Sequence, residues 1–153
     1  MVRRFLSRYQ DFTLPLLRIV TGALFMQHGM QKLFGWFGGF ARTPGATAPL
    51  FSLMGVAGLL EVVGGLAIVV GAFTQVVAFV LSGMMAVAYF MAHAPRGFWP
   101  TQNDGELAAL YAFVFLYLAT AGGGRWSLDS LQHLDDWEED RPPKFPEPAA
   151  ETK

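Results

Sequence analysis

Three ionisable residues stand out within hydrophobic stretches of the first half of the chain. His28 and Lys32 lie four residues apart, and Glu61 interrupts a long hydrophobic stretch. Histidine and glutamate move protons in many active sites, and a lysine ammonium donates hydrogen bonds to carbonyl and carboxylate oxygens. We therefore predict Glu61 and His28 as candidate catalytic residues, acting as proton acceptor and proton donor. A structural carboxylate, hydrogen-bonded to another helix, is the alternative for Glu61.

A second group of candidates could bind a ligand. Histidine, amide and carboxyl groups would fix the orientation of a ligand, and aromatic rings would pack on it. The candidate ligand-binding residues are Lys32, Tyr89, His93, Asn103, Glu106 and Phe113. Asn103 and Glu106 also have the spacing of a helix-capping box, which is the structural alternative for that pair.

The composition excludes several classes of protein and site. The chain has no cysteine, which excludes disulfides, thiolate catalysis, Fe–S clusters and cysteine-ligated zinc, and we predict no metal site. The formal net charge is -1, without the clustered positive excess of a nucleic-acid-binding protein. Only 15% of the 153 residues are charged and 53% are hydrophobic, whereas an average soluble domain is about 25% charged. This composition indicates a membrane protein.

Four charge-poor stretches would position the candidate residues. Each approaches the about 20 residues that cross a bilayer core. No charge lies on any face between Val76 and Phe90, whereas a helix of a soluble bundle would have a polar face. We therefore predict an all-α fold, an integral membrane four-helix bundle. The predicted spans are residues 13–34, 49–73, 76–94 and 106–121.

Arginine residues predict the orientation of the bundle and its division into domains. The amino end contains Arg3, Arg4 and Arg8, and Arg125 follows soon after the last span, as is typical of cytoplasmic segments. We therefore predict that both termini are cytoplasmic. Residues 1–12 form a basic amino terminus, 13–131 the membrane domain, and 132–153 an acidic, proline-rich and disordered tail. A short surface helix is predicted from Ser127 to Trp137, with Ser127 as its N-cap.

This topology brings the polar candidates to one end of the bundle. Glu61 lies about 16 Å below the outer end, at 1.5 Å per helical residue. Charges inside a bilayer are costly, so their gathering predicts a polar cavity at the outer end. Arg18 shares one helix face with Thr21, Phe25, His28 and Lys32, and this face is expected to point into the bundle. Arg18 also lies near the cytoplasmic end, where the alternative is that its long side chain reaches the lipid headgroups. The residues expected at the outer end are His28, Lys32, His93, Asn103 and Glu106.

These residues resemble the pattern of the DoxX family of small bacterial membrane proteins. The resemblance covers roughly residues 14–131. It implies a multi-pass protein of the bacterial inner membrane. The family takes its name from resemblance to the small subunit of a thiosulfate:quinone oxidoreductase. Some members are implicated in membrane-associated oxidoreductase complexes. The matching residues are Arg18, His28-Gly29, Lys32, Gly58, Glu61, Gly64-Gly65, His93, Asn103, Glu106 and the segment Gly124-Arg125-Trp126-Ser127-Leu128-Asp129.

The resemblance and the polar cluster together favour a quinone- or lipophile-binding subunit or accessory of a membrane-associated oxidoreductase system. Quinone carbonyls require hydrogen-bond donors, and quinol oxidation requires a proton acceptor. Quinone is therefore the expected cofactor, and the expected partners are membrane lipids and redox proteins of the membrane or cytoplasm. A haem held by His28 and His93 is disfavoured, because the chain shows no other haem signal.

Two other functions fit the same residues. The first is a non-enzymatic membrane protein that binds a lipid or small molecule, or serves as a scaffold. The second is a proton-coupled transporter, although the chain shows no inverted repeat and so short a transporter would have to oligomerise. Whether the protein is an enzyme, and whether it forms a homo-oligomer, stays open at this point.

Overall fold

The computed structural model describes residues 9–132, which are helical and contain no strand. The prediction of an all-α fold is confirmed, and the long helices follow the predicted spans closely. The long helices are α2 (Gln10–Phe34), α3 (Leu53–Val70), α4 (Thr74–Ala88) and α6 (Glu106–Ala121). The short elements are η1 (Phe40–Arg42), the π-helix η2 (Tyr89–His93), η3 (Ala94–Arg96), α5 (Pro100–Asn103) and α7 (Leu128–Gln132).

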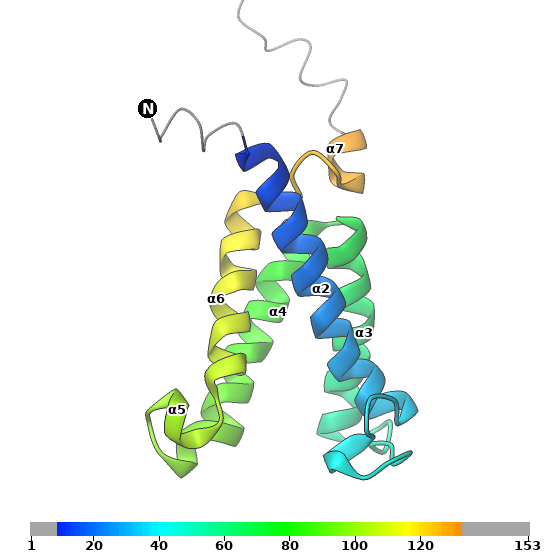
Figure 1. The fold of residues 1–153 in the computed structure, drawn as a ribbon, viewed down its shortest axis with the longest axis vertical. Helices are drawn as coiled ribbons and strands as arrows, with labels where there is room; N and C mark the ends of the chain where they lie inside the picture. Colours follow the sequence, from blue (N-terminus) through cyan, green and yellow to red (C-terminus); the bar gives the residue numbers. More distant parts are fainter. Residues whose placement is uncertain (1–8, 133–153) are drawn as a thin grey trace, which may run out of the picture.

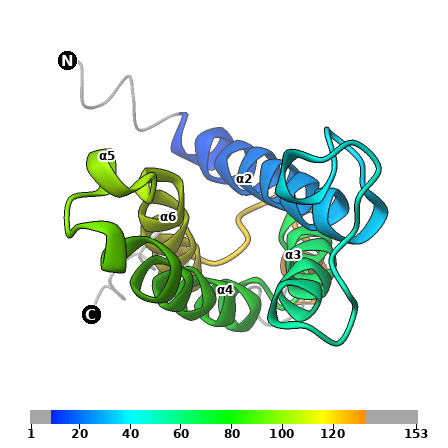
Figure 2. The same ribbon diagram turned by 90° about the horizontal axis from the view of Figure 1, so that it is seen from below.

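The long helices form two pairs that diverge toward one end of the molecule (Figure 1). Helix α2 packs along α3, and α4 packs along α6, whereas α2 has few contacts with α6. The pairs meet beside α7, which we call the closed end. At the opposite, open end, the loop between α2 and α3 lies apart from the loop that contains α5 (Figure 2). The described chain begins and ends at the closed end.

Glycines let α2 and α3 approach each other at backbone distance. A Cβ added to Gly29 would lie 2.6 Å from the carbonyl oxygen of Gly58, and one added to Gly22 would lie 2.8 Å from that of Gly65. No side chain larger than hydrogen fits at such contacts, which are typical of helix packing in membranes. The α2–α3 pair is therefore a tightly packed unit.

An aromatic cluster joins the two pairs midway along the molecule. The rings of Phe25 and Phe115 meet edge to face, with centroids 4.8 Å apart, and Phe25 meets Tyr111 in the same way at 5.1 Å. Phe25 and Phe115 are buried together with Leu81 and Ile68. This apolar layer separates the closed end from the space between the diverging pairs.

The exterior of the helices is that of a membrane protein. Within the described residues, Leu53–Val70 and Thr74–Arg96 are long and apolar enough to span a membrane, and Glu106–Ala121 is a shorter apolar helix. Large hydrophobic side chains, such as those of Val63 and Phe79, point outward along these helices. A soluble monomer rarely exposes so extensive an apolar surface.

The end of the described chain bears on two predictions about the carboxyl-terminal region. Ser127 caps α7 as predicted, because its hydroxyl oxygen accepts a hydrogen bond of 3.1 Å from the backbone N–H of Ser130. The described helix ends at Gln132, so its predicted continuation to Trp137 lies outside the described residues. The predicted basic segment 1–12 is described only from residue 9, and the predicted tail 132–153 only at its first residue.

Candidate functional site

A buried arginine holds the closed end together. The guanidinium of Arg18 donates to the carbonyl oxygens of Gly123, at 2.9 Å, and Val69, at 2.6 Å, and also to those of Ile68 and Trp126. It therefore ties the last turn of α3 to the segment that follows α6. The expectation that Arg18 reaches the headgroups is wrong, because its side chain is 0% exposed and finds its acceptors inside the protein.

An aspartate also connects elements at the closed end. The Asp129 carboxylate accepts hydrogen bonds from the backbone N–H groups of Phe73, at 2.7 Å, and Thr74, at 2.8 Å. These N–H groups belong to the first turn of α4 and have no partner within the helix. The Asp129 N–H in turn donates to the Gly71 carbonyl at 2.9 Å. The polar side chains of the closed end thus form hydrogen bonds with backbone groups at the ends of helices.

Toward the open end, an ion pair connects α2 to α3. The ammonium of Lys32 lies 2.7 Å from Oε1 and 2.5 Å from Oε2 of Glu61. The side chain of Glu61 is 7% exposed and that of Lys32 is 19% exposed. Gly58 lies one turn before Glu61, and its missing side chain leaves room for Lys32, whose Cβ would be 3.0 Å from an added Cβ.

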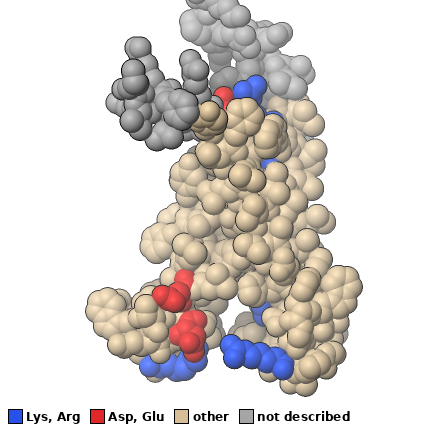
Figure 3. Space-filling model, in the orientation of Figure 1, with Lys and Arg blue, Asp and Glu red and all other residues tan. Residues whose placement is uncertain are grey.

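This ion pair borders a cavity of about 310 Å³ between the diverging helix pairs. Most of the lining is apolar, and it includes Met84 and Met85 of α4. The volume is at the lower end of the range for small-molecule sites, about 300–1,000 Å³. Charged side chains gather on both lobes of the open end, on either side of a hollow (Figure 3). The polar lining residues are His28, Lys32, Glu61, His93, Asp104 and Tyr111.

Two rings form part of the wall between α2 and α6. The imidazole of His28 meets the ring of Tyr111 edge to face, with centroids 6.2 Å apart and planes at 85°. Tyr111 stacks in turn on Phe115, with centroids 5.7 Å apart. Both rings therefore rest on the aromatic layer, with His28 one helical turn from Lys32.

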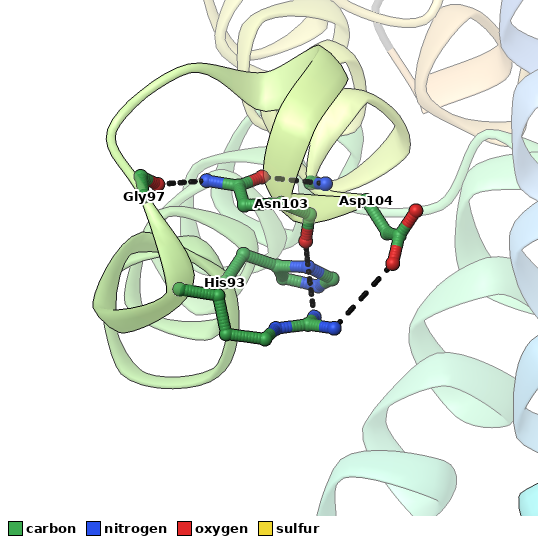
Figure 4. Close-up of polar contacts among 6 residues, drawn as sticks. His93, Gly97, Asn103 and Asp104 are labelled. Atoms are coloured by element: carbon green, nitrogen blue, oxygen red, sulfur yellow. Dashed lines mark hydrogen bonds and ion pairs between the residues drawn. The ribbon is translucent and has the colours of Figure 1, made fainter.

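His93 of η2 also lines the cavity, and it is held by the loop that contains α5 (Figure 4). Its Nδ1 lies 3.0 Å from the carbonyl oxygen of Asn103 and 3.1 Å from Nη2 of Arg96. Arg96 also pairs with the Asp104 carboxylate at 3.4 Å. The rim at His93 therefore carries both a cation and an anion.

The structure brings four of the predicted site residues to one cavity and places the other four elsewhere. Glu61, His28, Lys32 and His93 line it. The residues outside its lining are Tyr89, Asn103, Glu106 and Phe113.

Two of the four outside residues hold the loop between η3 and α6. The buried Tyr89 hydroxyl donates to the Phe98 carbonyl. The Asn103 amide donates to the Gly97 carbonyl at 2.5 Å, and its Oδ1 accepts from the Gly105 N–H at 2.8 Å. The side-chain amide of Asn103 therefore forms its hydrogen bonds within the loop. The prediction that Asn103 lines the cavity is wrong.

The other two outside residues lie on the exposed side of α6. Glu106 is the first residue of this helix and is exposed, and Gly105 is the N-cap. The predicted capping box is therefore wrong. Phe113 is 73% exposed, so its predicted inward orientation is also wrong. Because α6 is apolar on all sides, hydrophobic periodicity does not determine which face points inward. The buried face consists of Ala108, Tyr111, Phe115 and Leu118.

Sequence reasoning missed Tyr111 and Asp104. Tyr111 was missed because Phe113 was predicted to contact the ligand, and these two residues lie on different faces of α6. The sequence indicates a loop at Asp104, because this residue precedes Gly105. Aspartate also tolerates the left-handed backbone that Asp104 adopts at φ 59°.

Comparisons with known proteins find sequence similarity over most of the chain. A family model described as DoxX matches residues 13–94. An uncharacterized protein of Haemophilus influenzae is 40% identical over 128 residues, which are 82% of this chain and 94% of that protein. No solved structure matches the chain. The segment matched by the family model contains His28, Lys32, Glu61 and His93, the predicted residues that line the cavity.

Proposed function

This chain belongs to the DoxX family, and from that membership and the chemistry of the cavity we propose that it binds a quinone or a similar lipophile. In this proposal it is a multi-pass protein of the bacterial inner membrane and a subunit or accessory of a membrane-associated oxidoreductase system. The bound quinone is the cofactor, and a membrane or cytoplasmic redox protein is the partner.

The observation that carries the proposal is the Lys32–Glu61 ion pair in the wall of a largely apolar cavity. A flat ring with polar substituents fits such a site, because the apolar lining buries the ring while a few polar groups orient it. The Lys32 ammonium and the His28 imidazole can donate hydrogen bonds to a ring carbonyl. The Glu61 carboxylate can accept a proton from a ring hydroxyl.

The side chains of the cavity indicate which chemistry the protein supplies and which the ligand supplies. A quinone supplies two-electron, two-proton redox chemistry when bound. In this proposal the cavity residues hold the ring, and Glu61 and His28, which both line the cavity, move the protons. Electrons would reach the quinone from a partner protein.

Binding of a quinone with a short tail, such as decylubiquinone, tests this proposal. Calorimetry on the protein in nanodiscs measures the affinity of wild type and of Glu61→Gln, which keeps the shape of the side chain and removes its charge. We expect at least a tenfold loss of affinity in Glu61→Gln, and no loss in the matched Glu106→Gln, whose side chain lies outside the cavity.

The same experiment distinguishes the alternatives. Wild-type protein that binds no quinone would overturn the proposal. Mass spectrometry of lipophiles that co-purify with the protein would then identify the ligand of a non-enzymatic binding protein. Equal quinone affinity in both variants would remove Glu61 from the site.

We further propose that the four long helices span the membrane with both termini in the cytoplasm and the open end outside. Arginine is concentrated near the termini, at Arg3, Arg4, Arg8 and Arg125, as in cytoplasmic segments. The chain has no native cysteine, so single cysteines can be labelled with a membrane-impermeant maleimide in intact cells. We expect Thr43→Cys to react and Thr152→Cys to be protected; the reverse pattern would overturn this orientation.

A further inference from the structure

The seam between α2 and α6 contains a second hollow that the site described above does not use. The two helices have few contacts and lie apart over the lower half of Figure 1. A groove of about 330 Å³ lies along this seam. Four of its lining residues belong to it and not to the central cavity: Leu24, Gln27, Gln31 and Phe37.

The groove and the central cavity share one wall. His28, Leu107 and Tyr111 line both of them. These side chains therefore form the partition between the groove and the cavity.

The partition consists of side chains that can move without the backbone. The structure describes ring contacts for His28 and Tyr111 and no hydrogen bond of either side chain to the described residues. Rotation about the side-chain torsions of His28 would connect the groove to the cavity. Such rotamer changes are fast where no hydrogen bond opposes them.

The two exits from the cavity differ in charge. At the open end, Arg96 and Asp104 lie on the rim and Lys32 lies below it. The lining of the groove contains no charged side chain among the described residues. A hydrocarbon chain attached to a ligand in the cavity would avoid the charged rim and follow the groove, because covering charged groups with apolar surface removes their water and costs free energy.

We propose that the groove between α2 and α6 is a lateral portal for the hydrocarbon tail of the ligand. An amphiphile with a long tail enters from the lipid, its polar head reaches the Lys32–Glu61 pair, and its tail stays between Leu24 and Leu107. This inference rests on the proposed function and adds to it the class of ligand, a long-tailed lipophile, and its route.

A bulky residue in the groove tests the portal. Leu24→Trp places an indole at the groove wall, and Leu59→Trp is the matched control on α3, because the two leucines are 49% and 48% exposed and Leu59 lines neither hollow. For each variant in nanodiscs, calorimetry measures the affinity for decylubiquinone and for the corresponding benzoquinone without a tail. The ratio of the two affinities reports what the tail contributes.

We expect Leu24→Trp to reduce this ratio at least tenfold and to leave the tail-less benzoquinone affinity within twofold of wild type. Leu59→Trp should leave both affinities unchanged. An unchanged ratio in Leu24→Trp, with the tail-less compound bound normally, would overturn the portal and leave the proposed function standing. Failure of wild type to bind either compound would overturn both.

Discussion

The closed and open ends of this molecule each contain a cation of α2 that bonds to α3, and the two cations differ in what they contact. Arg18 donates to the backbone carbonyls of Ile68 and Val69 and is fully buried. Lys32 pairs with the side chain of Glu61 beside a cavity. A charge within an apolar helix therefore does not by itself indicate a ligand site. Its partners distinguish a structural role, in which the charge bonds to backbone carbonyls, from a ligand-binding role, in which it pairs with a side chain beside a cavity.

The partners also explain why each end has its shape. At the closed end, Arg18 bonds both to the last turn of α3 and to Gly123 after α6, and Asp129 accepts from the first N–H groups of α4, so the helix pairs are bound together there. At the open end, Lys32 and Glu61 both belong to the α2–α3 pair, and their bond does not reach α4 or α6. The two pairs are thus free to diverge around the cavity.

The largest effect on stability should come from removing the closed-end cation. Arg18→Met leaves buried carbonyls without donors, at about 1–3 kcal/mol for each unsatisfied group, with effects that are not fully additive. We expect a loss of about 3 kcal/mol or more in the free energy of unfolding, measured by denaturant titration in detergent. Arg125→Met is the control, since the Arg125 side chain is 71% exposed and its pairing with Asp11 is a surface contact. A similar loss in both variants would contradict the structural role of Arg18.

A smaller effect should follow from separating α2 and α3 at their close contact. Gly29→Ala places a Cβ 2.6 Å from the Gly58 carbonyl oxygen, so backbone must shift. Such overpacking costs about 1–3 kcal/mol. Gly83→Ala on α4 is the control, because nothing lies within 4 Å of its added Cβ. If Gly83→Ala has a lower Tm than Gly29→Ala in thermal unfolding, the contact between α2 and α3 does not limit stability.

The smallest of the closed-end effects should come from the cap of α4. Asp129→Ala removes the acceptors of the Phe73 and Thr74 N–H groups, and loss of such a cap costs about 1 kcal/mol. Asp129→Asn keeps one acceptor oxygen and should have an intermediate stability in the same denaturant titration. Equal stability of the two variants and wild type would show that the cap contributes nothing measurable.

The elements of the fold were predictable because the chain marks them by composition. The charge-poor stretches coincide with α2, α3, α4 and α6. On α2, the polar stripe of Arg18, Thr21 and His28 predicted the inward face, because a charged side chain that faces lipid is costly. Helix α6 has no such marker after its first residue, so its buried face could not be read from the sequence.

The site was predictable only in part, for a related reason. Glu61, His28, Lys32 and His93 were placed at one cavity by their depth and spacing. Asn103 belongs to the same end, but its amide is used by the backbone of its own loop. Arg18 was expected at the headgroups because the carbonyls that it binds come from segments distant in sequence. Such long-range partners follow from the packing of helices and not from local pattern.

The contrast between the two ends is tested most directly by replacing the open-end ion pair with apolar side chains of similar size, Lys32→Met together with Glu61→Leu. Replacing a buried ion pair in this way is often neutral or stabilising. If the pair serves binding, the double variant keeps its free energy of unfolding within about 1 kcal/mol of wild type and loses its affinity for decylubiquinone. Loss of stability with unchanged quinone affinity would show that Lys32 and Glu61 hold the fold, as Arg18 does, and would contradict their assignment to the ligand.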